Sequence, residues 1–405
     1  MNSRSDGYPF IPMLVPAIVA TLGGCESQPT ATGAVPVQIE DSAGVRIVEY
    51  AGKPDIEAPF RFLAEPRYRH GTNPSDYAFQ RMSAGRLLPD GSAVVADAFA
   101  TEVIVLTADG TTYDLLAGPG EGPGDVSYVN AIFAIGRDSI WVSDPFGDRL
   151  TLFARGSVAR TVDIRRADGL GADGIGSSGH LLMSTSSFIS GFEVEWLPGH
   201  MARFDMETGA VDTVASYDHV SRVPQGLRWD PIGALGSVAV AAGQFVYARS
   251  DKPEVIWRRP DGTVTQIVRW QAEAVPLTEA LLEGIEAGMR EGNQMANPGA
   301  SVAEINQMTA DNMSTYRARV GGAMPLFSRL FGDTEGRVWL PSWHPGTARE
   351  GAAAYTVISA DGEWLGTVEA PPRLRILDVA GGLVLGAQLD DMDVESVAVY
   401  ELDGS

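Results

Sequence analysis

Turns that contain glycine recur along most of this chain, and their spacing limits its fold more than any other feature. The corresponding glycines are separated by 46, 53, 53, 100 and 42 residues, at Gly110, Gly156, Gly209, Gly262, Gly362 and Gly404. Short apolar runs lie between the turns, as in strands joined by hairpins. A repeat of this length, made of strands, is typical of an array of similar β units.

The segment 79–117 shows one repeat clearly, because four apolar runs alternate with Pro-Asp-Gly and Ala-Asp-Gly turns. We predict five complete four-stranded units, near 79–117, 129–164, 175–217, 232–270 and 324–369, and a three-stranded sixth at 374–402. The orphan strand Gly44–Tyr50 alternates apolar and polar residues, so we expect it to complete the sixth unit. This pairing would close a ring and remove exposed sheet edges. The predicted fold is all-β, a six-bladed β-propeller closed by the N-terminal strand.

A helical insertion is expected at about 275–322, between blades four and five. Leu277, Leu281, Leu282, Ile285 and Met289 share one helical face. A capping box at 301–304 predicts the start of a second helix. An apolar stripe on a helix is usually buried, so the insertion is interpreted as a packing lid, with a binding role as the alternative.

The N-terminus has the parts of a secretory signal. Arg4 precedes the apolar run 10–20, which is too short to span a membrane, and Leu22-Gly23-Gly24-Cys25 follows. This tetrapeptide resembles the bacterial lipobox, in which the cysteine receives lipid and becomes the new N-terminus. We therefore predict a lipoprotein signal peptide at 1–24, lipidation of Cys25, a tether at 25–40 and a propeller at 41–405. Glu26 after the cysteine favours the outer membrane of the cell envelope, and an incidental free cysteine is the alternative.

The charge of the chain argues against one class of partner. Asp and Glu number 52 and Lys and Arg 30, so the formal net charge is −22. Without a basic cluster to neutralise phosphates, nucleic-acid binding is not expected. Cations and basic partners remain open, and we expect a monomer.

Two segments carry a family resemblance. VVADAFATEVIVLTADG at 94–110 and IWVSDPFGDRLTLFARG at 140–156 resemble NHL-type repeats, and the glycine-rich stretch from 118 is similar to the inter-blade joint of that family. DSAGVRIVEY at 41–50 and the phrase at 324–343 resemble a group of bacterial six-bladed propeller lipoproteins of undefined role. The resemblance covers about 41–402 and implies the fold, whereas it implies little about function.

The glycine-rich stretch 118–124 has two interpretations, a phosphate-binding loop or a joint between blades. A phosphate loop should lead into a helix, but this one leads into the apolar run 131–135, which has the pattern of a strand. We therefore interpret it as a joint, in which glycine lets the chain return to the ring centre.

Long loops are predicted to gather on one face of the propeller. In an up-and-down blade the second-to-third turns and the inter-blade loops share a face. The long segments 118–126, 184–200, 221–231, 274–324 and 343–352 all fall in these positions. Because binding surfaces are often loops on a rigid scaffold, we expect binding there.

Candidate site residues follow from that placement. Trp343, His344, Arg228 and Trp229 are the candidate binding anchors, and packing of the tryptophans between blades is the alternative. Glu121 and Asp125 could add an acidic rim, with Ca²⁺ as an alternative ligand, although no compact calcium motif is present. Asp97 and Asp144 end corresponding strands and are interpreted as structural acceptors of backbone hydrogen bonds, with a metal ligand or general base as the alternative.

No catalytic residue or cofactor is predicted, since the five histidines are scattered and no GxSxG motif occurs. Two classes of function remain. The favoured one is a lipid-anchored binding or scaffolding module for a protein or polymer at the envelope. The other is a cation-dependent hydrolase or lactonase, like the gluconolactonase-type propellers.

Overall fold

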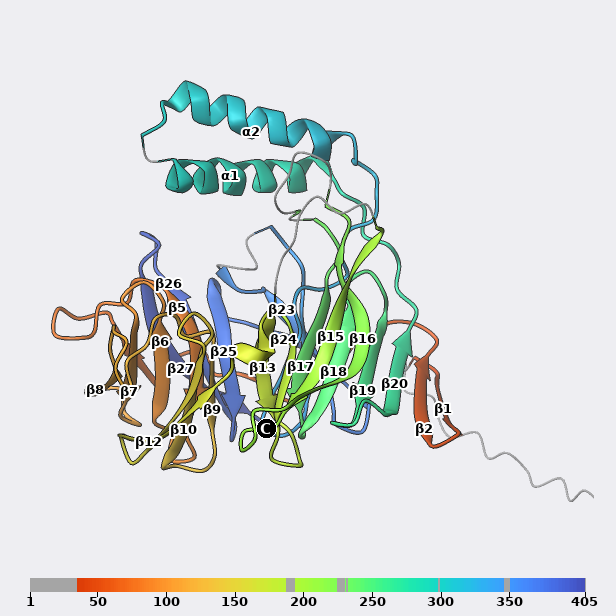
Figure 1. Cartoon of the computed structure of the whole chain (residues 1–405). Helices are drawn as coiled ribbons and strands as arrows, with labels where there is room; N and C mark the ends of the chain where they lie inside the picture. The colour runs from red at the N-terminus through yellow and green to blue at the C-terminus, as the bar shows by residue number, and fades with distance from the viewer. Residues whose placement is uncertain are drawn as a thin grey trace, which may run out of the picture. The chain divides into compact units, whose positions relative to one another are not determined.

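The computed structural model describes residues 35–186, 194–223, 230, 232–297, 299–345 and 350–404 (Figure 1). Cys25 and the signal-peptide and tether residues up to 34 lie outside the described residues. All structural statements below concern the described part of the chain.

Six antiparallel sheets form the blades of a six-bladed β-propeller. The first two blades are β5 to β8 and β9 to β12, with the bounds Met82–Leu87, Ala93–Asp97, Glu102–Leu106 and Tyr113–Ala117, then Ala131–Ala134, Ser139–Asp144, Arg149–Ala154 and Ser157–Asp163. The third and fourth are β13 to β16 and β17 to β20, with the bounds Leu170–Ile175, Leu181–Thr185, Trp196–Phe204 and Val211–Ser221, then Gly236–Ala241, Gln244–Arg249, Glu254–Arg258 and Val264–Trp270. The fifth and sixth are β21 to β24 and β25 to β27, with the bounds Phe331–Gly332, Val338–Pro341, Ala354–Ile358 and Trp364–Glu369, then Leu374–Ala380, Leu383–Leu389 and Glu395–Asp403. A short 3₁₀ helix, Arg165–Ala167, joins blades two and three.

The sixth blade is completed by N-terminal residues, so the ring is closed as predicted, but by a different strand. β4, Tyr68–His70, pairs antiparallel with β27, and the short β3, Arg61–Phe62, pairs with the end of β27. The prediction that Gly44–Tyr50 fills this position is wrong. That segment forms β2, Val45–Tyr50, which pairs in parallel with β20 at the outer edge of blade four.

A second N-terminal strand extends the same edge. β1, Val37–Ser42, forms a hairpin with β2, which makes blade four a six-stranded sheet. Residues 37–40, expected in the tether, therefore belong to a strand. Tyr50 of β2 packs between blades four and five, in one cluster with Trp270 and Trp364. Its hydroxyl accepts a hydrogen bond from Trp364 N at 2.8 Å, and its ring packs edge-on against the Trp364 ring.

The core consists of layers between neighbouring blades. All five residues of β6 are buried because the strand is covered on both faces. Val95 contacts the cluster shared with blade six, whereas Val94 and Ala96 contact the cluster shared with blade two. Successive strand residues point to opposite faces, so a strand between two blades is apolar throughout instead of alternating.

Two helices occupy the connection between blades four and five, as predicted. α1 spans Glu279–Ala296 and α2 spans Val302–Arg317, and the two lie side by side (Figure 1). The Thr278 side chain caps α1, and Ser301 and Glu304 form the predicted capping box of α2. These caps satisfy backbone N–H groups that the first helical turn leaves unpaired.

The glycine-rich stretch 118–124 connects β8 of blade one to β9 of blade two and precedes no helix. Val126 N donates to Gly118 O at 2.9 Å, so the loop folds back on itself. Gly124 has a φ of 91°, in the left-handed region that favours glycine. The stretch is a joint between blades.

Candidate functional site

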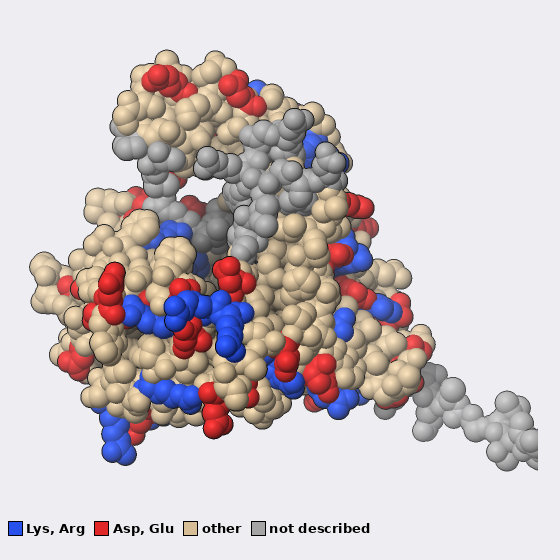
Figure 2. All heavy atoms as spheres, viewed as in Figure 1, with Lys and Arg blue, Asp and Glu red and all other residues tan. Residues whose placement is uncertain are grey.

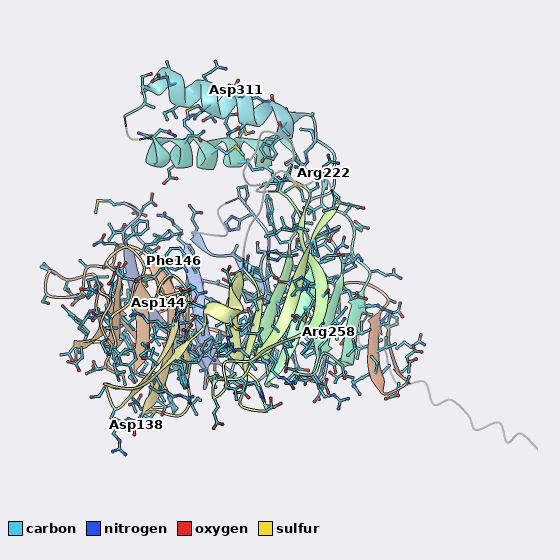
Figure 3. The ribbon with its side chains drawn as sticks, in the orientation of Figure 1. Asp138, Asp144, Phe146, Arg222, Arg258 and Asp311 are labelled. Carbon is cyan, nitrogen blue, oxygen red and sulfur yellow. The ribbon has the colours of Figure 1, made fainter. Side chains whose placement is uncertain are left out.

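The second-to-third turns and inter-blade loops define one face of the propeller, which we call the loop face. Blade two shows the two ends of a blade directly, because Asp138 in a first-to-second turn and Phe146 in a second-to-third turn lie at opposite ends of it (Figure 3). The helical insertion follows β20, so it leaves the propeller from the loop face.

The apolar stripe of α1 is buried within the insertion and against nearby loops. Leu282 and Ile285 share a cluster with Met313 and Tyr316 of α2. Ile232, from the segment that enters blade four, joins the same cluster, and Trp343 packs against it half-buried. The insertion is therefore attached to blades four and five through apolar contacts. Acidic side chains lie on the outer side of the two helices (Figure 2).

A pocket of about 450 Å³ lies on the loop face between blades four, five and six. We call it the loop-face pocket. Its apolar wall includes Phe327, Phe331, Tyr355 and Trp343. Apolar and aromatic walls with a few polar groups are typical of ligand-binding pockets, and this volume suits one or two large side chains or a small molecule.

His344 lines the pocket beside Trp343 and is fixed by a backbone contact. Its Nε2 donates a hydrogen bond to the carbonyl oxygen of Gly351 at 2.7 Å. Gly351 has a φ of 82°, and a Cβ there would collide with the carbonyl of Leu374 in blade six. The loop therefore needs glycine at 351 to bring His344 to the pocket wall.

Two arginines line the pocket. Arg375 of β25 donates through Nη2 to Met82 O at 2.8 Å and lies 3.6 Å from the carboxylate of Glu395. Burial lowers the pKa of Arg375 from its usual value, against the effect of Glu395. Arg329, which precedes β21, is the second cation. The pocket thus combines aromatic walls with guanidinium groups, a composition typical of protein recognition sites.

The positive charge of Arg329 favours the ionised form of Asp173, a residue of the inner strand β13. Burial raises the pKa of Asp173 to about 7, while a hydrogen bond from Ser184 and the Arg329 charge oppose the shift. The Asp173 Oδ2 atom is buried and has no hydrogen-bond partner within the described part of the chain. The sequence analysis missed this residue, because Ala172-Asp173-Gly174 has the same letters as the hairpin turns at 108–110 and 360–362.

The residues predicted as a binding set are not all brought together. Trp343 and His344 both line the loop-face pocket. Glu121 and Asp125 lie on the joint between blades one and two, where Asp125 accepts a hydrogen bond from Gly122 N at 2.8 Å. Glu121 is exposed and contributes its carbonyl oxygen to Arg149. Arg228 and Trp229 lie outside the described residues.

Asp97 and Asp144 are buried acceptors of backbone hydrogen bonds. Asp97 accepts from the amides of residues 80, 81, 99 and 100 at 2.6 to 3.2 Å. Asp144 accepts from the amides of residues 127, 128 and 147 at 2.8 to 3.0 Å, and from Arg149 Nε at 3.2 Å. Through these hydrogen bonds, each carboxylate connects the end of a second strand to the neighbouring loops.

Within the described ranges, no group of three or more His, Cys, Asp or Glu side chains is arranged to hold a metal ion. Across the same ranges, neither helix combines the length and the apolar character needed to span a bilayer.

Neither a protein-family model nor a curated protein matches this sequence. Several solved structures resemble this chain in fold. An exported-protein candidate from Bacteroides fragilis has a TM-score of 0.50 at 9% identity, over 88% of this chain and 99% of that one. A member of the DUF4221 family from Bacteroides vulgatus has a TM-score of 0.49 at 11% identity, over 86% and 100%. A gluconolactonase from Xanthomonas campestris has a TM-score of 0.43 at 12% identity, over 87% and 98%. The likeness is one of fold alone.

Proposed function

We propose that this chain is a lipid-anchored propeller of the cell envelope that binds a protein partner through its loop face, without chemical turnover. The observation that supports this most is the loop-face pocket, where Trp343, Phe327 and Tyr355 stand beside Arg329 and Arg375. Tryptophan, tyrosine and arginine dominate the energetic centres of protein interfaces. The envelope location rests on the lipobox-like sequence before Cys25.

The geometry also supports a pocket that is largely formed before the partner arrives. His344 is held by the Gly351 carbonyl, and Arg375 is held by the Met82 carbonyl of the neighbouring blade. Side chains fixed in this way lose little conformational entropy on binding, which favours affinity.

The test is partner capture by the full chain in its native membrane, followed by affinity measurement with the identified partner. Trp343→Ala is expected to weaken binding by about 1–2 kcal/mol or more, and His344→Ala to weaken it as well. His180→Ala is the matched control, because His180 lies in a first-to-second turn at the other end of blade three. Equal affinity of all three variants for the partner would contradict the proposal.

The competing function is a cation-dependent lactonase or hydrolase. Elemental analysis of the purified protein, paired with a lactone and ester screen with and without chelator, separates the two functions. A stoichiometric metal together with chelator-sensitive hydrolysis would show that the protein is an enzyme instead.

A further inference from the structure

Three large apolar side chains stand out on the loop face because they are almost fully exposed. Met392 is 81% exposed, Phe146 is 77% exposed and Phe99 is 73% exposed. They are three of the four most exposed large apolar residues in the described part of the chain. Single exposed apolar residues are common on protein surfaces, but these three recur at equivalent positions of the fold.

The three residues occupy the same turn of three consecutive blades. Phe99 lies between β6 and β7 of blade one, Phe146 between β10 and β11 of blade two, and Met392 between β26 and β27 of blade six. Blade six contacts blade one through β25 and β5, and blade one contacts blade two through β5 and β9. The three tips therefore follow one another around the loop face. We call this set the apolar arc.

Each turn of the arc is fixed by an aspartate that begins it. Asp97 Oδ1 accepts from Phe99 N at 3.1 Å, and Asp390 Oδ1 accepts from Met392 N at 2.8 Å. In blade two, Asp144 Oδ1 accepts at 2.9 Å from the amide of Gly147, next to Phe146. The turns thus hold the apolar tips outward in a defined conformation, which lowers the entropic cost of binding.

Phe146 has a second support. Its ring stacks on Tyr128 with a centroid distance of 4.9 Å and an interplanar angle of 27°. Tyr128 is itself held, because its amide donates to Asp144 Oδ1 at 3.0 Å. A ring that is both exposed and braced is suited to act as an interface anchor.

The surroundings of the arc are acidic. The three turns, 97–102, 144–149 and 390–395, contain eight acidic residues and one basic residue, Arg149. Three of the eight, Asp97, Asp144 and Glu395, are buried, and Asp393 pairs with Arg373. Arg149 is engaged by Asp144 and by carbonyl oxygens of the joint 118–124. Asp148, Asp390 and Asp391 are exposed. A partner that covers the arc therefore meets these exposed carboxylates, which favour basic side chains.

We infer that the apolar arc is a docking surface for a basic segment of a partner protein that inserts apolar side chains between Phe99, Phe146 and Met392. This inference rests on the proposed function and adds the chemistry of the partner and a second contact region beyond the loop-face pocket. A bilayer fits the arc less well, because the acidic turns repel anionic headgroups.

The test uses the full chain in its native membrane with a photo-crosslinking amino acid placed at 99, 146, 392, 343 or 135. Crosslinks at the three arc positions to a lysine- or arginine-rich protein segment are expected, and none at 135. Ile135 is the control, because it is 52% exposed in a first-to-second turn on the other face. Crosslinks at 343 without crosslinks at the arc would overturn this inference and leave the proposed function standing. Crosslinks to lipid, or to an acidic segment, would also overturn it, and their absence at every position would overturn both.

Affinity for the identified partner gives a second measurement. Replacing the arc by Phe99→Ser, Phe146→Ser and Met392→Ser is expected to weaken binding at least about tenfold. Thermal stability should change little, because the side chains are exposed and only the Phe146–Tyr128 ring contact is lost. Ile135→Ser should leave affinity unchanged. Affinity should also fall as salt is raised, since the charges are at the surface. Unchanged binding by the triple variant, or binding that does not respond to salt, would contradict the inference.

Discussion

Arg319 donates through Nη1 to Asp230 Oδ2 at 2.8 Å, an ion pair that joins the end of the helical insertion to the segment entering blade four. The Asp230 side chain is only 4% exposed, whereas that of Arg319 is 34% exposed. Asp230 also accepts from the amide of Ile232 at 3.1 Å, which places that apolar side chain in the cluster under the helices. The pair therefore ties the insertion to the segment that enters blade four, and Asp230 also lines the loop-face pocket.

Removing Arg319 is expected to destabilise the insertion. Arg319→Ala leaves a buried carboxylate without its cation, and we expect a loss of about 1–3 kcal/mol. Arg317→Ala is the matched control, because Arg317 pairs with Glu286 at the surface and such pairs contribute about 0–1 kcal/mol. Urea unfolding, with hydrogen exchange of α1 and α2, measures both. Equal losses in the two variants would contradict the assignment.

Two N-terminal truncations should differ sharply. A chain that begins at residue 53 lacks β1 and β2 but keeps β3 and β4, so its ring stays closed. Its free energy of unfolding should fall by about a few kcal/mol, because the buried side chains of Val48 and Tyr50 are lost. A chain that begins at residue 72 leaves β27 with an open edge and should not fold cooperatively. Thermal unfolding followed by circular dichroism compares the two. A cooperative transition at the same midpoint in both would show that β4 does not close the ring.

Asp173 predicts a pH dependence of stability. Its pKa is raised from 3.8 to about 7 in the folded state, so between these values the folded protein binds a proton that the unfolded chain releases. Its contribution to stability is therefore fully present below about pH 4 and is lost as the pH rises through about 7. Asp173→Asn should reduce the decline in unfolding free energy over this range, measured by urea titration at several pH values.

The control for this prediction is Asp261→Asn. Hydrogen bonds from Thr263 lower the pKa of the exposed Asp261, so its contribution is lost as the pH falls below about 4, outside the range used. Asp261→Asn should leave the decline in unfolding free energy between pH 5 and 7 the same as in the unsubstituted protein. If Asp173→Asn behaves in the same way, Asp173 does not titrate in that range.

Lipidation of Cys25 remains a prediction from sequence. Mass spectrometry of the protein extracted from its native membrane is expected to show a lipid-modified N-terminal Cys25. Cys25→Ser should release the protein from the membrane fraction. Recovery of unmodified Cys25 from the membrane would contradict this.

The repeat of apolar runs and turns was enough to predict six blades, their approximate boundaries and the helical insertion. These features are local, because a strand between two blades must be apolar on both faces and a hairpin needs particular residues at its turn. The capping box at Ser301 was readable for the same reason, since it depends on residues only three apart.

Which distant strands pair with one another was decided only by the tertiary structure. The sequence makes Gly44–Tyr50 a strand, but burial of Val48 and Tyr50 between Trp270 of blade four and Trp364 of blade five accompanies its pairing with β20. The closing strand is instead the three-residue β4, whose His70 is buried and hydrogen-bonds the Gly110 carbonyl. A strand so short carries no clear sequence pattern.

The same limit applies to the site. Ala-Asp-Gly is a turn at 108–110, where Gly110 has a φ of 66°, yet at 172–174 it lies within strand β13. There Gly174 leaves room for Val240 of the next blade, and the Oδ2 atom of Asp173 is buried, while the charge of Arg329 opposes the rise in the pKa of Asp173. The sequence determined which residues are strand, turn or helix over most of the chain, because these preferences arise from neighbouring residues. The pocket and the closure were decided by packing between blades, because they join side chains far apart in the chain.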